Sequence, residues 1–64
     1  MSDPVTVELG KYDSIDGIHC GVTIDYQVTC GGNTTVLEND GDEFTFDRHG
    51  ITVKRNESDV TFTK

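Results

Sequence analysis

The side chains best suited to chemistry in this sequence are two cysteines and two histidines. Cys20 and Cys30 are ten positions apart, His19 precedes the first cysteine, and His49 lies far downstream. Structural zinc sites use closely spaced cysteine pairs and closely spaced histidine pairs, and neither spacing is present here. We therefore predict that the protein holds no metal ion and no cofactor.

Both cysteines fall within a run of alternating residues that predicts one long strand. Apolar side chains occupy every second position from Ile18 to Cys30, with polar residues or glycine between them. A period of two places the whole apolar set on one face of a strand. Cys20 and Cys30 would then be ~33 Å apart, well beyond the about 7 Å between Cα atoms that a disulfide can bridge. The pattern predicts two buried free thiols and a reducing, cytoplasmic setting.

Carboxylates are the other abundant reactive group, with twelve acidic residues against five basic ones and a net charge of −7. The segment 38–43 is dense in oxygen ligands. Counted from Asp40, however, Ile51 occupies the twelfth position, which an EF-hand loop fills with Glu. Nothing marks two carboxylates as neighbours in a cleft, and no glycine-rich loop precedes a helix. We therefore predict a non-enzymatic protein.

The elements that would position these residues are strands. The sequence has no Ala and no Trp, it has nine Thr, and its apolar residues are mostly Val, Ile and Phe. Residues of these types fit a pleated, half-buried surface, whereas the residues that favour helices are scarce. Composition alone predicts an all-β protein.

Turn residues divide the chain into short segments. We expect a first strand at residues 5–9, followed at residues 10–17 by a loop or one short helical turn with Tyr12 and Ile15 pointing inward. The long strand at residues 18–30 should bend at Gly21. Turns rich in Gly, Asn and Asp separate further strands that we expect at residues 34–38, 43–47, around 51–53 and around 60–62.

Together these patterns predict a single domain over residues 1–64. We expect an antiparallel meander of about five to six strands, folded as a coiled sheet or a partly closed barrel. An open sheet covered by a second copy is the alternative, so the expected state is a monomer or a homodimer. We expect no signal peptide, because the first residues have neither a basic segment nor an apolar one, and no apolar run is long enough to predict a membrane span.

The charge carries the functional hypothesis. A chain this acidic should be repelled by nucleic acid and by anionic membranes, so we expect its partner to be a basic protein surface. Carboxylates on a stiff sheet can imitate the phosphates of a nucleic acid and occupy the basic channel of a nucleic-acid-handling protein. Small phage inhibitors of host defence, anti-CRISPR proteins among them, have this profile as a class, which is an analogy of type. The predicted partner-binding residues are Asp13, Asp16, Asp25, Glu38, Asp40, Asp42 and Glu43.

The alternative hypothesis is a salt-adapted small structural or assembly domain with no inhibitory role. An excess of Asp, Thr and Val with few Lys is consistent with a high-salt cytoplasm. In that case the acidic surface keeps the protein hydrated and soluble, and any function lies in assembly through the sheet.

Overall fold

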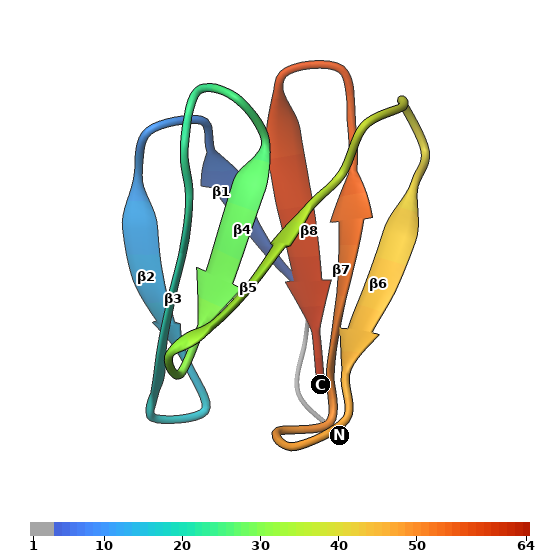
Figure 1. Ribbon diagram of the computed structural model, residues 1–64. Helices are drawn as coiled ribbons and strands as arrows, with labels where there is room; N and C mark the ends of the chain where they lie inside the picture. The colour runs from blue at the N-terminus through green and yellow to red at the C-terminus, as the bar shows by residue number, and fades with distance from the viewer. Residues whose placement is uncertain (1–3) are drawn as a thin grey trace.

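The computed structural model describes residues 4–64 and contains two four-stranded antiparallel sheets (Figure 1). The first sheet has the order β1-β8-β7-β6 and comprises β1 (Val5–Glu8), β6 (Glu43–Phe46), β7 (Ile51–Arg55) and β8 (Asp59–Thr63). The second has the order β2-β3-β4-β5 and comprises β2 (Tyr12–Ile15), β3 (Ile18–Val22), β4 (Gln27–Cys30) and β5 (Asn33–Val36). The all-β prediction is confirmed, but the described residues form eight strands where five to six were predicted.

One hydrophobic core holds the two sheets together. It draws side chains from both of them, and Phe62 and Ile51 are its largest fully buried members. Burying a side chain of this size contributes ~1.5–3 kcal/mol relative to leaving it exposed. The predicted barrel closure is wrong, because β5 and β6 are the outer strands of separate sheets and do not pair with each other. The buried set is Val7, Ile15, Cys20, Val22, Val28, Cys30, Leu37, Phe46, Ile51, Val53, Val60 and Phe62.

The long strand predicted over residues 18–30 is wrong, because the chain reverses at residues 23–26 and forms a hairpin of β3 and β4. The Thr23 N–H donates to the Gln27 carbonyl at 2.9 Å. The Thr23 hydroxyl oxygen accepts from the backbone N–H groups of Asp25 and Gln27 at 3.3 and 3.2 Å. A threonine that satisfies its neighbours' N–H groups in this way stabilises a turn in place of an extended ladder.

The alternation of apolar and polar residues continues with the same phase on both sides of the turn, so the sequence pattern does not reveal the turn. Register partners across the hairpin, such as Val22 and Val28, differ by an even number of positions, so inward-facing residues keep the same phase on both strands. The turn residues are where the structure departs from the predicted strand. Ile24 is 73% exposed, and Tyr26 adopts a φ of +62°.

The same turn overturns the predicted separation of the two cysteines. Cys20 on β3 and Cys30 on β4 are direct register partners, so they are cross-strand neighbours. The predicted burial is confirmed, since both side chains lie in the core, and both are free thiols in this structure.

Within residues 10–17, Tyr12–Ile15 form strand β2, so the predicted loop or helical turn is wrong. Ile15 points inward as predicted, but Tyr12 is 66% exposed. The Tyr12 ring lies on Gly21, where the Cβ of any other residue would overlap the ring. Gly21 therefore allows the Tyr12 ring of β2 to pack closely on β3, and β3 does not bend there as predicted. In the strand predicted at residues 34–38, Leu37 is buried and Val36 is exposed.

The predicted strands of the C-terminal half are confirmed as β6, β7 and β8. Phe44 and Phe46 share one face of β6 as predicted, and their ring centroids are 5.1 Å apart in a T-shaped arrangement. Strand β8 lies between β7 and β1, so the first strand of the chain joins the same sheet as the last three.

Candidate functional site

The sheets have connections at two ends, and most of the predicted acidic residues lie at one of them. The β1–β2, β3–β4, β5–β6 and β7–β8 connections lie at the upper end in Figure 1, and the other three turns lie at the lower end. We call the surface formed by the β3–β4, β5–β6 and β7–β8 connections the acidic end. Its acidic residues are Asp25, Glu38, Asp40, Asp42 and Glu57 in the connections, to which we add Glu43, the first residue of β6.

Five of the seven predicted binding residues belong to the acidic end, and two do not. Asp13 lies on β2, an outer strand of its sheet. Asp16 lies in the β2–β3 turn at the opposite end, where the Lys64 ammonium donates to its carboxylate at 2.6 Å. This hydrogen bond and the positive charge of Lys64 hold the pKa of Asp16 below its ordinary value.

Arg55 joins the three connections of the acidic end from beneath. Its guanidinium NH1 donates to the Leu37 carbonyl at 2.8 Å, and its guanidinium carbon lies 3.5 Å from the centroid of the Tyr26 ring. The Tyr26 hydroxyl donates to the Glu57 carbonyl at 2.6 Å. Arg55 Nε is 3.3 Å from Asp40 Oδ1 but does not form a hydrogen bond with it. Residues from all three connections are thus tied to one cation–π pair.

The carboxylates of the acidic end differ in the hydrogen bonds and ion pairs that they form within the protein. The Asp42 carboxylate accepts from the Asn39 N–H at 2.9 Å, and Asp40 is paired with Arg55. Glu43 lies across the ladder from Lys54. Four acidic side chains of this end form no hydrogen bond or ion pair within residues 4–64: Asp25, Glu38, Glu43 and Glu57. Each of the three connections therefore presents at least one unpaired carboxylate to solvent.

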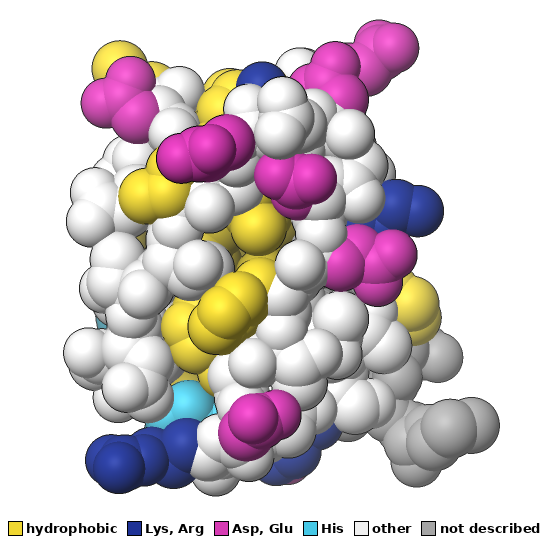
Figure 2. Space-filling view, turned by 45° about the vertical axis from the view of Figure 1, so that its right-hand side comes forward, with side chains coloured by type: hydrophobic (Ala, Val, Ile, Leu, Met, Phe, Trp, Pro, Cys, Tyr) yellow, Lys and Arg dark blue, Asp and Glu magenta, His cyan; other side chains and the backbone are white. Residues whose placement is uncertain are grey.

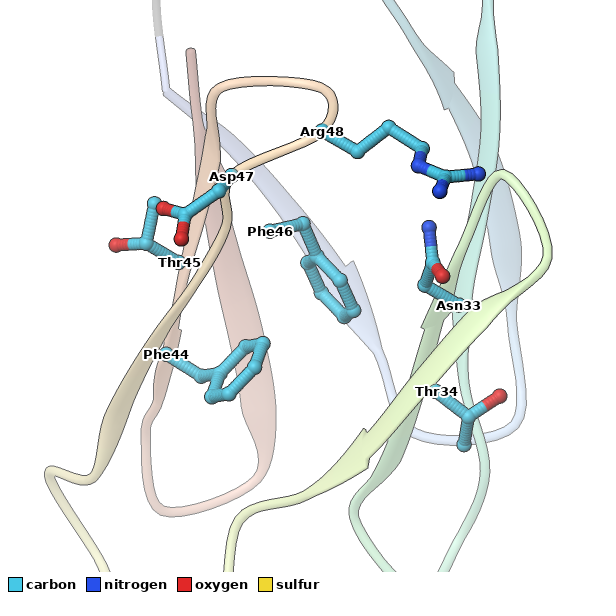
Figure 3. Close-up of a pocket in the computed structure, with 7 residues that line it drawn as sticks. All are labelled: Asn33, Thr34, Phe44, Thr45, Phe46, Asp47 and Arg48. Atoms are coloured by element: carbon cyan, nitrogen blue, oxygen red, sulfur yellow. The ribbon is translucent and has the colours of Figure 1, made fainter.

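A groove separates the unpaired edges of β5 and β6. It has a volume of about 280 Å³, and Phe44 and Phe46 point into it, whereas Asp47 points away (Figure 3). Arg48 reaches over Asn33 at one end of the groove (Figure 3). Figure 2 shows hydrophobic side chains along this side of the molecule, acidic side chains mostly above them, a histidine side chain below them, and basic side chains at the bottom, the right edge and the top.

Two further features of the described chain bear on its chemistry. Within residues 4–64, no three His, Cys, Asp or Glu side chains come together as a group that could bind a metal ion. The same residues contain no helix of a length and apolarity that could cross a membrane.

Comparison of the chain with protein-family models, with curated proteins and with solved structures finds no match. The functional argument therefore rests on the geometry of the acidic end.

Sequence reasoning missed three residues that shape this end: Tyr26, Arg55 and Glu57. Tyr26 falls on the apolar face of the predicted long strand, and the sequence around Arg55 carries no motif that marks it. Their partners are distant in sequence, with 31 positions between Tyr26 and Glu57 and 18 between Arg55 and Leu37. No local pattern reveals a contact over such separations, so only the fold brings them together.

Proposed function

We propose that this protein is a non-enzymatic interaction module whose acidic end binds a basic surface of a nucleic-acid-handling protein. One observation carries the proposal. Three connections distant in sequence each bring a solvent-facing carboxylate, Asp25, Glu38 or Glu57, to the same end of the molecule. The guanidinium of Arg55, at the end of β7 beside these connections, is turned inward, and the Arg55 side chain is 18% exposed.

The arrangement suits recognition of a Lys- or Arg-rich surface. Clustered charges of one sign raise the local concentration of an oppositely charged partner and speed its association. The Arg55–Tyr26 contact limits motion between the connections, so less conformational entropy is lost when a partner binds. A protein that occupies a nucleic-acid channel in this way would compete with the nucleic acid itself, and its binding would weaken as salt concentration rises.

The test compares two triple variants that remove the same charge. The first carries Asp25→Asn, Glu38→Gln and Glu57→Gln, one substitution in each connection of the acidic end. The matched control carries Asp13→Asn, Asp16→Asn and Asp47→Asn, which lie on β2 and in the turns of the opposite end. Wild type and both variants are immobilised and exposed to lysate of the source cell at low and high KCl. Retained proteins are identified by mass spectrometry, and duplex DNA is then added as a competitor.

We expect wild type and the control to retain the same nucleic-acid-binding proteins at low salt and to release them when DNA is added. The acidic-end variant should retain them at least tenfold less. Equal retention by all three proteins, or retention that DNA does not displace, would refute the proposal. Equal losses in the two variants would show that net charge alone matters, as expected for a salt-adapted domain. The control also tests whether Asp13 and Asp16 share in binding.

A further inference from the structure

Cys20 and Cys30 occupy a cross-strand position that suits a covalent bond. In the β3–β4 ladder, the Gly31 N–H donates to the His19 carbonyl at 2.9 Å. His19 and Gly31 therefore form a hydrogen-bonded pair, and the next pair along, Cys20 with Cys30, is of the non-hydrogen-bonded kind. Cα atoms in such pairs are ~4.5 Å apart with their side chains close together. This separation lies within the range of about 4.4–6.8 Å found across disulfides.

The surroundings of the two thiols decide when they can react. Cys20 is 1% exposed and Cys30 is 0% exposed, and both belong to the core between the sheets. Burial raises the pKa of both thiols, and the neighbouring Cys20 raises the pKa of Cys30 further. Because the thiolate is the nucleophile in disulfide exchange, the folded protein protects the pair from oxidants. The unfolded chain and the folding chain expose it.

We propose that Cys20 and Cys30 are the site of a cross-strand disulfide, which a low-molecular-weight disulfide such as oxidised glutathione installs before the core closes. One cysteine thiolate attacks oxidised glutathione, forms a mixed disulfide and releases one glutathione thiolate. The second cysteine thiolate attacks the protein sulfur of that mixed disulfide and releases the second glutathione. The protein loses two protons and two electrons, and one oxidised glutathione becomes two reduced molecules.

The bond would join the two inner strands of the second sheet at the centre of its core-facing side. It closes a loop from residue 20 to residue 30, which includes the β3–β4 turn and Asp25 of the acidic end. Constraining a loop of this length in the unfolded chain should raise the melting temperature by roughly 10–20 °C. A domain this small gains much from one such crosslink.

The experiment is oxidative refolding of the full chain. The reduced protein is unfolded in urea and diluted into a glutathione buffer containing both oxidised and reduced forms, or into dithiothreitol. Intact mass, free-thiol content and melting temperature by circular dichroism are then measured. We expect a monomer lighter by two hydrogen atoms, with no free thiol and a higher melting temperature than the reduced protein. The folded reduced protein in the same glutathione buffer should react at least tenfold more slowly.

The variants Cys20→Ala and Cys30→Ala serve as controls, because each retains one cysteine and can form only a glutathione adduct or a dimer. The proposal fails if refolded wild type keeps both thiols, ends as an adduct or a dimer, or melts below the reduced form. It also fails if the folded protein is oxidised as fast as the unfolded chain. None of these measurements involves the proposed partner, so the two proposals stand or fall separately.

Discussion

Replacing Arg55 by Met tests whether the cation–π pair holds the acidic end together. Methionine keeps a long apolar stem over Tyr26 but removes the guanidinium. The lost interactions are the hydrogen bond to the Leu37 carbonyl, the stacking on Tyr26 and the approach to Asp40. All three connections of the acidic end would lose their common anchor.

The expected cost follows from the surroundings of each interaction. A hydrogen bond from a charged donor contributes ~1.5–3 kcal/mol. A cation over an aromatic ring contributes ~0.5–1 kcal/mol when exposed and about 2 kcal/mol when desolvated, and Arg55 is only 18% exposed. The pair with Asp40, whose side chain is 69% exposed, should add ~0–1 kcal/mol because solvent screens it. Folding of the wild type removes water from the guanidinium, and Arg55→Met avoids that cost, which offsets part of this sum. We therefore expect the unfolding free energy to fall by about 2–4 kcal/mol.

Urea unfolding followed by circular dichroism measures this loss. A domain of this size has an unfolding free energy of roughly 3–10 kcal/mol and a urea dependence of about 1 kcal/mol per molar. The unfolding midpoint of Arg55→Met should therefore fall by ~2–4 M, whereas that of Asp40→Asn should fall by no more than ~1 M. Combining Arg55→Met with Tyr26→Leu in a double-mutant cycle should give a coupling of about 0.5–2 kcal/mol.

Two results would refute this reasoning. If Asp40→Asn cost as much as Arg55→Met, the exposed ion pair and not the buried contacts would hold the end together. If the coupling between positions 26 and 55 were zero, the ring would not sense the cation. Should Arg55→Met fail to fold, Arg55→Lys takes its place, because lysine keeps the charge but not the planar fork. The unfolding midpoint of Arg55→Lys should lie below that of wild type and below that of Asp40→Asn.

Three further predictions address single features. Ile24→Ser should change the unfolding free energy by less than about 0.5 kcal/mol, since Ile24 is 73% exposed; a loss of several kcal/mol in urea unfolding would instead support the long buried strand. Lys64→Ala should raise the pKa of Asp16 toward its ordinary value of 3.8 in a carboxyl NMR titration, and should remove the share of stability that wild type loses as pH falls through the lowered pKa. Because the pKa values of Cys20 and Cys30 are raised in the folded state, their contribution is complete below the ordinary value of 9.0 and declines as pH rises above it; melting curves should show a steeper alkaline decline for reduced wild type than for the double alanine variant.

The sequence predicted the strand character and most of the inward-facing residues, because both follow from the period of two. Val22, Val28, Val53 and Phe62 are buried as their patterns indicate. The period cannot distinguish a continuous strand from a hairpin whose register partners share parity, and the 18–30 segment shows this ambiguity. Composition likewise predicted strands, but it holds no information on how eight strands divide between two sheets.

The candidate site was predicted in part for a related reason. Acidic residues in turns can be identified from sequence, since turns favour Asp, Asn and Gly. Which turns share an end depends on the number of strands between them, and one wrongly joined strand reverses that count. Treating residues 18–30 as one strand hid the β3–β4 turn, so the prediction places Asp25 on a strand face. Two strands separate the β5–β6 and β7–β8 turns in either arrangement, so the absence of Glu57 from the predicted set has no such cause.

The placement of Arg55 bears on the choice between a binding surface and a salt-adapted coat. Salt adaptation requires only that acidic side chains be hydrated, and it sets no condition on where they lie or on what lies beneath them. Here a cation is partly desolvated under the three connections, at a cost that scattered surface carboxylates would not require. It anchors the backbone of these connections through Leu37 and Tyr26, while Asp25, Glu38 and Glu57 are left without protein partners in the described chain. Unpaired carboxylates carried on an anchored backbone suit binding to a basic surface, and hydration alone would not require that anchoring.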